Sequence, residues 1–333
     1  MAKPSMDIPI TERDLYRHDG HVSIYIGATH WCNLRCAHCY DQFAQGGITV
    51  DQASHIVREV EGCDFMHPFY DISGGEVMGL SYWDKLLEIF LGSGREVQVN
   101  TNGTLINKQS INRLVAVNER YRDRLFLSVS LDSHDWEINR ANRLGAASDN
   151  VYAGMELLRR HGVRFRVAIT LTSRNRPTIA DTIRFIVKNY TREFIVGVLR
   201  PVFPMAKDGL GMLVSLPEVQ RVKAEILGLQ KEIGTFTMYH TLGASGQAFC
   251  RAGLDRINIE PNGDVTSCYA LQGQGHVIGN LFHEPLLDIV RRMQKIHLNR
   301  DERYLLCEHQ EKRWGEVPDE LKLGLSMAES ENG

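Results

Sequence analysis

The feature that most constrains this chain is an alternation of short apolar segments with longer amphipathic ones, from His21 to about Arg200. The short segments are typical of buried strands, and the longer ones carry apolar residues three and four positions apart, as helices do. We predict strands at Val22–Ile26, Phe69–Ile72, Val97–Asn100, Leu125–Leu131, Phe165–Leu171 and Phe194–Leu199. We predict helices between them at Val50–Glu61, Tyr82–Leu91, Gln109–Asn118, Asn150–His161 and Thr178–Tyr190.

Strands that alternate with helices form a parallel sheet covered by those helices. Six such units are fewer than the eight of a closed barrel, so the expected fold class is α/β, a partial (β/α)6 TIM barrel with its site at the carboxyl ends of the strands. Thr49 before the first helix and Pro177 at the start of the fifth are typical helix-start residues. With 333 residues, 43% of them hydrophobic, the chain can bury a core of that size.

The last third of the chain follows another pattern. A helix is predicted over Leu216–Ile233, and Pro261-Asn262-Gly263-Asp264 is a turn between strand candidates Arg256–Glu260 and Val265–Tyr269, ahead of a helix at Pro285–Met293. We therefore expect a small C-terminal α+β domain made of a hairpin plus a helix. The predicted organisation is an N-terminal extension (1–20), the partial barrel (21–212), a linking helix (213–240), the small domain (241–318) and a loosely ordered tail (319–333).

Charge and hydropathy exclude several partners. The net charge is −3 with both signs interspersed, and no basic stripe carries interleaved aromatic residues, which argues against nucleic acid and membrane lipid. No apolar run approaches the roughly 18–20 residues that cross a bilayer, and residues 1–17 lack the apolar stretch of a secretory signal. The expected location is the cytoplasm, where thiols stay reduced, so the seven cysteines indicate metal binding rather than disulfides.

Cys32, Cys36 and Cys39 follow the first predicted strand with the spacing C-x3-C-x2-C. Three thiolates on one loop can hold three irons of a cubane cluster and leave the fourth iron open to the amino and carboxylate groups of a bound amino acid. The alternatives are a structural zinc site completed by His38, and thiols that bind no metal.

This segment resembles the signature of the radical S-adenosylmethionine (SAM) superfamily, and the ordered motifs that carry the resemblance span roughly residues 21–200. The resemblance implies a [4Fe–4S] cluster on Cys32, Cys36 and Cys39, with SAM on its open iron. Electron transfer into SAM then gives a 5′-deoxyadenosyl radical. The family often has an aromatic residue before the last cysteine, where this chain has His38, and Tyr40 matches a residue that often faces the adenine.

Ser73-Gly74-Gly75-Glu76 follows the second predicted strand. Gly74 and Gly75 let the backbone approach a ligand closely, and the Glu76 carboxylate can accept a protonated amine. The element resembles the Gly-Gly-Glu motif of the family, which implies that these three residues bind the amino group of SAM. The alternative is an ordinary turn.

Two later strand ends carry further candidates for cofactor binding. Asn102 belongs to a Thr-Asn-Gly sequence that resembles a family element and also fits simple turn chemistry. Ser128, Ser130 and Asp132 share one face of their strand, where hydroxyl and carboxylate groups could bind the ribose hydroxyls of SAM.

Arg143 resembles the arginine that pairs with the carboxylate of SAM through bidentate bonds, although Leu144 follows it where the family has glycine. Asn175 and Arg200 follow the fifth and sixth predicted strands. For these two residues, a role in the site and a solvated surface role are equally open.

Cys250, Cys268 and Cys307 form a second set in the last quarter of the chain. The predicted hairpin brings Cys250 and Cys268 together, and the spacing C-x12-G-x4-C resembles the start of a SPASM domain or its shorter twitch version. The resemblance implies an auxiliary [4Fe–4S] cluster on the three cysteines. Four thiolates are usual, so the fourth ligand would be His309, Cys63, substrate or none.

Two alternatives remain for this second set. It could hold a structural zinc ion. One of its thiols, Cys250 being the candidate catalytic residue, could instead donate a hydrogen atom to a substrate radical. Cys63 follows a predicted helix and is expected to be a buried structural thiol.

These motifs predict an oxidoreductase- or epimerase-type enzyme that cleaves SAM and abstracts a hydrogen atom inside a barrel that excludes water. The resemblance implies a polar natural-product substrate, either a sugar or aminocyclitol or a ribosomal peptide, which is oxidised, epimerised or cross-linked. A small polar substrate, or a peptide recognised without a separate peptide-binding domain, is slightly favoured, because 31 residues before Cys32 are few for such a domain. An electron donor such as flavodoxin or ferredoxin is implied. The alternative is a non-catalytic, cysteine-ligated metal-binding or redox-sensing protein.

Overall fold

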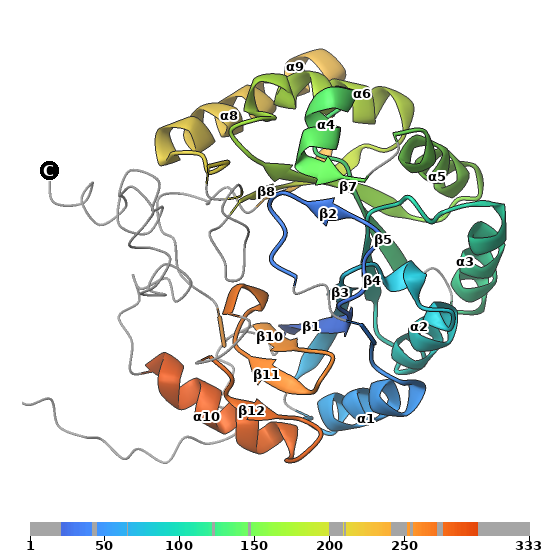
Figure 1. Cartoon of the computed structure of the whole chain (residues 1–333), viewed down its shortest axis with the longest axis vertical. Coiled ribbons are helices and arrows are strands. Elements are labelled where there is room, and N and C mark those ends of the chain that lie inside the picture. The colour runs from blue at the N-terminus through green and yellow to red at the C-terminus, as the bar shows by residue number, and fades with distance from the viewer. Residues whose placement is uncertain are drawn as a thin grey trace, which may run out of the picture.

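The computed structural model describes residues 21–41, 45–64, 66–121, 124–145, 148–199, 209, 211–240, 252–253, 256–271 and 276–298. These residues form a ten-stranded sheet that bends around a central space, with helices on its outer face (Figure 1). The predicted fold class, an α/β partial barrel, is confirmed. No helix in these ranges is long and apolar enough to cross a membrane.

The strand order in the sheet is β12-β11-β10-β1-β3-β4-β5-β7-β8-β9. Neighbours from β10 to β9 are parallel, while β11 and β12 run antiparallel at one edge. The strands are β1 (His21–Thr29), β3 (His67–Gly74), β4 (Val97–Thr101), β5 (Leu125–Ser130), β7 (Phe165–Leu171), β8 (Glu193–Val198), β9 (Thr237–His240), β10 (Arg256–Ile259), β11 (Asp264–Thr266) and β12 (Gly279–Asn280). A separate small ladder pairs β2 (Arg35–Cys36) with β6 (Arg143–Leu144).

Amphipathic helices cover the outer face of this sheet. In α1 the Thr49 side chain accepts a hydrogen bond from the Gln52 amide and forms a capping box, as its position before the helix predicts. Pro177 lies in a short 3-10 turn that leads into α6. The helices are α1 (Val50–Glu61), α2 (Trp83–Gly92), α3 (Lys108–Arg120), α4 (Trp136–Asn142), α5 (Ser148–Arg160), α6 (Ile179–Asn189), α8 (Leu216–Gly228), α9 (Gln230–Ile233) and α10 (Leu286–Leu298).

All six strands and all five helices predicted for the barrel are present, with ends that differ from the prediction by at most three residues. The sequence analysis did not predict α4, β9 or the β2–β6 ladder. These elements are short, and strand pairs of two residues carry no periodic signal. The longer predicted helix Leu216–Ile233 is divided into α8 and α9.

The C-terminal hairpin is part of the barrel sheet. β10 pairs in parallel with β1, from Ser23 opposite Arg256 to Ile26 opposite Ile259. Next to it, the Leu281 carbonyl lies 2.9 Å from Nε2 of His55 on α1. Figure 1 shows the orange hairpin and α10 beside α1, where they extend the same wall. The predicted hairpin is confirmed, and the domain boundaries stay a prediction.

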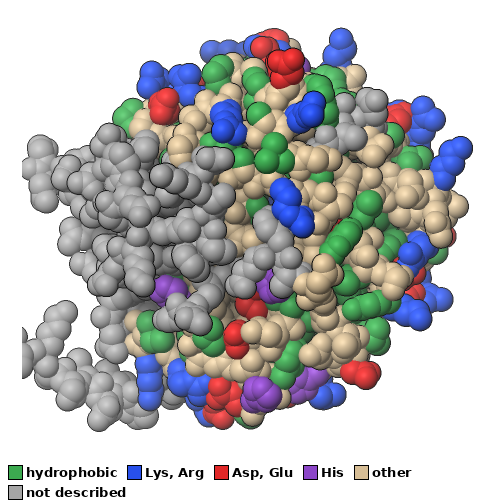
Figure 2. Space-filling view, viewed as in Figure 1, with side chains coloured by type: hydrophobic (Ala, Val, Ile, Leu, Met, Phe, Trp, Pro, Cys, Tyr) green, Lys and Arg blue, Asp and Glu red, His purple; other side chains and the backbone are tan. Residues whose placement is uncertain are grey.

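Side chains of the barrel strands point alternately into the core between sheet and helices and into the interior of the barrel. On β3, Tyr70 and Ile72 are fully buried in the core between sheet and helices. The alternate residues Phe69, Asp71 and Ser73 line a cavity inside the barrel. The two-residue period of a strand thus divides residues that pack in the core from residues that line the cavity. Charged side chains of both signs are scattered over the described part of the face shown in Figure 2.

Candidate active site

The loop that carries Cys32, Cys36 and Cys39 begins directly after β1 and is fixed at several points. The β2–β6 ladder pairs Cys36 with Arg143, and the Ala37 amide donates a hydrogen bond to the Asn142 carbonyl at 2.8 Å. The loop thus lies at the carboxyl ends of the parallel strands, where barrel enzymes place their sites.

The three thiols are free, and those of Cys32 and Cys39 face backbone amides. The Leu34 amide lies 3.4 Å from Cys32 Sγ, and the Asp41 amide lies 3.4 Å from Cys39 Sγ. Burial raises the pKa of all three thiols, that of Cys39 to about 12. Bare thiolates are therefore unfavourable here, whereas a bound iron cluster would stabilise them, and donors aimed at the sulfurs suit cluster ligation.

A zinc site on the same loop has no support among the described residues. Within them, no three histidine, cysteine, aspartate or glutamate side chains come close enough to share one metal ion. His38 Nε2 instead lies 3.8 Å from Asp132, and burial lowers the pKa of His38 to about 4. The chemistry of three free thiols on one loop fits a cluster that spreads its ligands over several irons.

Gly74 and Gly75 bring the end of β3 against the cysteine loop. A Cβ on Gly75 would lie 2.0 Å from the Trp31 carbonyl oxygen, and one on Gly74 would lie 2.2 Å from that of Thr29. The Gly75 and Glu76 amides donate hydrogen bonds to the Thr29 and Trp31 carbonyls at 2.6 and 2.7 Å. The close approach that the glycines permit is thus to the chain itself. Gly74 also lines the cavity.

Glu76 is fully buried, and its carboxylate accepts three hydrogen bonds from the protein. Oε1 accepts from the Thr101 hydroxyl at 2.8 Å and the Met78 amide at 3.2 Å, and Oε2 accepts from the Asn102 amide at 2.7 Å. Burial raises the pKa of Glu76. The carboxylate does not line the cavity, so its predicted contact with the amino group of SAM stays a prediction.

Asn102 links the β4 end to the cysteine loop. Its Nδ2 donates to Asn33 Oδ1 at 2.9 Å and lies 3.8 Å from Cys32 Sγ. The sequence predicted Asn102 as a ligand of SAM, and the structure gives it a contact with a predicted cluster ligand. Hydrogen bonds to cluster sulfurs adjust reduction potential.

Asp132 and Arg143 form a buried ion pair next to the cysteine loop. Arg143 Nη2 donates to Asp132 Oδ1 at 3.0 Å, and Nε lies 3.0 Å from Oδ2. Both side chains are at least nine-tenths buried, and Arg143 also lines the cavity. The two residues predicted to bind different parts of SAM therefore contact each other. Removing either one would leave a buried charge unpaired.

Asn175 has no solvated surface role, because it is fully buried. Its Nδ2 donates to the Asp132 and Thr170 carbonyls, both at 2.8 Å, and thereby joins two strand ends. Arg200 lies outside the described residues.

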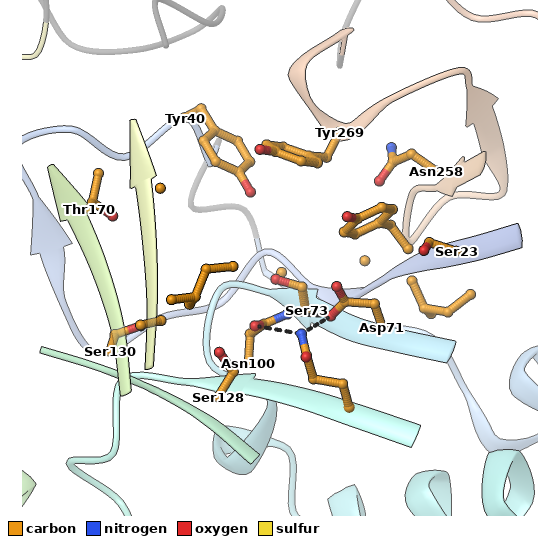
Figure 3. Close-up of a pocket in the computed structure, with 18 of the residues that line it drawn as sticks. Ser23, Tyr40, Asp71, Ser73, Asn100, Ser128, Ser130, Thr170, Asn258 and Tyr269 are labelled. Carbon is orange, nitrogen blue, oxygen red and sulfur yellow. Dashed lines mark hydrogen bonds between the residues drawn. The ribbon is translucent and has the colours of Figure 1, made fainter. Parts of the chain in front are cut away.

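One cavity of about 800 Å³ occupies the barrel interior. Five of the predicted residues line it, namely Tyr40, Gly74, Ser128, Ser130 and Arg143. Figure 3 shows Ser128 and Ser130 on one wall and Tyr40 beside Tyr269 across the cavity. Gly75, Glu76, Asn102 and Asp132 lie behind this lining. The structure thus brings the predicted residues to one end of the barrel, and their roles toward SAM stay predictions.

Several cavity residues escaped the sequence analysis. Asp71, Gln98, Arg166 and Arg256 line the cavity on strands that were predicted correctly. Polar residues at every second position of an otherwise apolar strand were the signal that could have found them. Tyr269 lies outside that signal, since it follows the hairpin, and its ring centroid is 5.7 Å from that of Tyr40.

The second cysteine set is described only in part. Cys268 directly precedes Tyr269, and Cys250 and Cys307 lie outside the described residues. The predicted ligand set of the auxiliary cluster and the predicted hydrogen-donor role of Cys250 therefore stay predictions. Cys63 is a buried thiol whose Sγ lies 3.5 Å from the Glu59 carbonyl, as expected for a structural role.

Comparison with known families gives the class of this protein. Residues 26–186 match the radical SAM superfamily, and residues 250–309 match SPASM, an iron–sulfur cluster-binding domain. Curated relatives include the antilisterial bacteriocin subtilosin biosynthesis protein AlbA of Bacillus subtilis, 27% identical over 77% of this chain and 56% of AlbA. The AdoMet-dependent heme synthase of Methanosarcina barkeri is 30% identical over 45% of this chain and 43% of its own. The chain spans about half the length of such relatives.

Solved structures share the fold. SuiB of Streptococcus suis, bound to its precursor peptide SuiA, has a TM-score of 0.70 at 19% identity, over 82% of this chain and 65% of SuiB. The enzyme anSMEcpe with bound AdoMet and a peptide has a TM-score of 0.67 at 16% identity, over 92% and 94% of the chains. The two family matches show that the chain carries a radical SAM domain and a SPASM domain, and these domains imply [4Fe–4S] clusters and SAM as cofactors.

Proposed function

We propose that Cys32, Cys36 and Cys39 hold the SAM-cleaving [4Fe–4S] cluster, and that the enzyme abstracts a hydrogen atom from a ribosomally made peptide. The observation that carries the proposal is the loop of three free thiols at the carboxyl end of a barrel with an internal cavity of about 800 Å³. When bound, the cluster and SAM would supply the 5′-deoxyadenosyl radical. The residues of the chain bind, orient and shield the reactants.

Each group around the loop has a distinct part in this proposal. The Leu34 and Asp41 amides stabilise the charge on two cysteine sulfurs. Arg143 faces the cavity and offers its guanidinium to an anionic group of SAM, while Asp132 fixes its orientation. Ser128 and Ser130 present hydroxyl groups to the same cavity, where they can bind the ribose. The barrel wall keeps bulk water from a reactive intermediate.

A peptide is the substrate class that the relatives aligned over most of this chain support. AlbA is named for the biosynthesis of a bacteriocin, and SuiB binds a precursor peptide in its structure. The sequence analysis left open a small polar substrate and a peptide recognised without a separate binding domain, and these relatives support the peptide. We expect oxidation, epimerisation or cross-linking of the peptide, with an electron donor such as flavodoxin or ferredoxin.

Iron and sulfide per chain after anaerobic purification test the first part of the proposal. We expect about eight irons in the parent and about four in the Cys32/Cys36/Cys39→Ala variant, one cubane for each cysteine set. The Cys63→Ala variant is the matched control, because that thiol is buried away from the loop, and it should keep the iron content of the parent. Zinc without iron in the parent would contradict the proposal.

Formation of 5′-deoxyadenosine from SAM under reducing conditions tests the second part. The parent should form it and the triple-cysteine variant should not. The peptide proposal fails if precursor peptides encoded beside related enzymes neither bind nor change mass while SAM is still cleaved.

A further inference from the structure

Asp71 projects into the barrel cavity from the middle of β3 (Figure 3). The residue is only 7% exposed. Its Oδ1 accepts hydrogen bonds from Gln98 Nε2 at 3.0 Å and Asn100 Nδ2 at 2.5 Å, both from β4. Two amides on the neighbouring strand thus fix the orientation of this carboxylate.

The second oxygen of Asp71 has no such partner. Among the residues that the structure describes, none donates a hydrogen bond to Oδ2. Burial raises the pKa of Asp71 to about 6, so the group is ionised at pH 7.5. Oδ2 is not sealed in the core but is open to the cavity, where water or a ligand can supply the donor. Oδ2 therefore marks a place in the cavity for a hydrogen-bond donor.

The rest of the lining decides what kind of donor suits this place. Four carboxylates line the cavity, namely those of Asp41, Asp71, Glu96 and Glu260. Four guanidinium groups line it too, those of Arg143, Arg164, Arg166 and Arg256. Arg166 and Arg256 act electrostatically on Asp71 itself, where they lower its pKa and would repel a cation. With charges balanced and serine hydroxyls between them, the lumen favours an uncharged polar group over an ammonium or a carboxylate.

We propose that Asp71 defines a substrate subsite that takes an uncharged amide or hydroxyl side chain of the peptide, with its N–H or O–H donated to Oδ2. The subsite rests on the proposed function, because it assumes a peptide that enters the barrel. Asp71 acts in it as a specificity-determining residue that binds the substrate away from the cysteine loop.

The Asp71→Asn variant tests this subsite because it replaces the hydrogen-bond acceptor that faces the cavity with a donor. The Gln98 and Asn100 amides need an acceptor, so the new side chain keeps its oxygen toward them and turns its N–H2 to the cavity. The probes are N-acetyl-glutamine amide and N-acetyl-glutamate amide, which match in size and differ in donor and acceptor. Binding to anaerobically reconstituted, SAM-loaded enzyme without reductant is measured by ligand-observed NMR.

We expect the parent to bind the glutamine probe about tenfold more tightly than the glutamate probe, and Asp71→Asn to reverse that preference. Asp181→Asn is the matched control, since Asp181 is on the exposed face of α6 and pairs with Arg184 at 2.7 Å. It should show the preference of the parent.

Two outcomes overturn the subsite. One is a parent that binds both probes equally, and the other is a preference that survives in Asp71→Asn. The same preparations are assayed for 5′-deoxyadenosine with reductant. If SAM is cleaved while Asp71→Asn keeps the probe preference of the parent, the subsite alone is wrong. If SAM is not cleaved, the proposed function is wrong, whatever the probes do.

Discussion

At the scale of single residues, two buried acids five positions apart differ in their hydrogen-bond donors and in their access to the cavity. Glu76 meets three protein donors and has no face on the cavity, whereas Asp71 meets two and leaves one oxygen toward it. A buried carboxylate that is fully satisfied holds the fold together. One that is partly satisfied is available to a ligand. The two acids should therefore respond differently to substitution.

Glu76→Ala should lower the free energy of unfolding by about 3 kcal/mol, because it leaves the Thr101 hydroxyl and two backbone amides buried without an acceptor. Urea unfolding under anaerobic conditions measures the change. Glu88→Ala is the control, since Glu88 pairs with exposed Arg120 and its loss should cost about 0.5 kcal/mol. Equal stability of both variants would contradict the network. SAM affinity in the same preparations tests the predicted contact of Glu76 with SAM.

Asp71→Asn should change how stability depends on pH. The folded pKa of Asp71 is raised to about 6, so the folded state favours the protonated form, and this stabilisation is full below the unfolded pKa and lost as pH rises through 6. Asn does not titrate. The variant should therefore gain about 1–2 kcal/mol on the parent between pH 5 and pH 8. Urea unfolding at both pH values measures this, and a constant difference would show that Asp71 is not so perturbed.

At the scale of elements, the end of β3 and the cysteine loop fit together through glycine. Gly75 faces the Trp31 carbonyl, and Gly79 lies where a Cβ would meet the Trp31 ring at 2.1 Å. Trp31 precedes Cys32 directly. The geometry of the thiols thus depends on how closely the end of β3 approaches the cysteine loop.

Gly75→Ala should push the loop outward and reduce the iron bound by the first cysteine set to less than half of the parent value. The physical reason is that a Cβ at this position would lie only 2.0 Å from the Trp31 carbonyl oxygen, a backbone clash that no side-chain rotation relieves. Iron and sulfide per chain after anaerobic reconstitution are the measurement. Gly92→Ala is the control, because a Cβ at the end of α2 meets nothing within 4 Å. Full iron content in Gly75→Ala would refute the dependence.

At the scale of the whole molecule, the C-terminal hairpin continues the barrel sheet on the side of β1. β1 is paired with β3 on one side and with β10 on the other, although about 230 residues separate it from β10 in the sequence. The first strand of the barrel is thereby an interior strand. Its stability depends on a segment near the other end of the chain.

The amides of β1 should therefore exchange with solvent as slowly as those of β4, and at least tenfold more slowly than those of β9 at the edge of the described sheet. Hydrogen exchange followed by mass spectrometry measures the protection of each strand. Ile257→Pro in β10 removes a donor from the pairing with β1 and should speed exchange in β1 while leaving β4 protected. Unchanged protection of β1 in this variant would mean that pairing with β10 contributes little to the stability of β1.

Much of the fold followed from local periodicity, and the limits of the prediction have physical causes. Strands such as Phe165–Leu171 and helices such as Val50–Glu61 were predicted with their observed ends, because pattern and caps agree. The pairing of β10 with β1 joins distant segments, and no local pattern encodes it. Glu76 was predicted to be a ligand from its Gly-Gly-Glu motif, and its three protein donors come from residues at the end of β4 and after β3 that the motif does not encode. The alternation of β3 could have identified Asp71 as a cavity residue, since it shares a face with Phe69 and Ser73.

The contact between Tyr40 and Tyr269 has a consequence for how the enzyme matures. Tyr40 follows Cys39, Tyr269 follows Cys268, and their ring centroids are 5.7 Å apart. Tyr269 also lies 5.4 Å from Tyr25 on β1, so the contact is anchored on the barrel. Thermodynamic linkage is reciprocal. If insertion of a cluster at one cysteine set restricts the motion of Tyr40 and Tyr269, insertion of the second cluster loses less conformational entropy. Each insertion then favours the other.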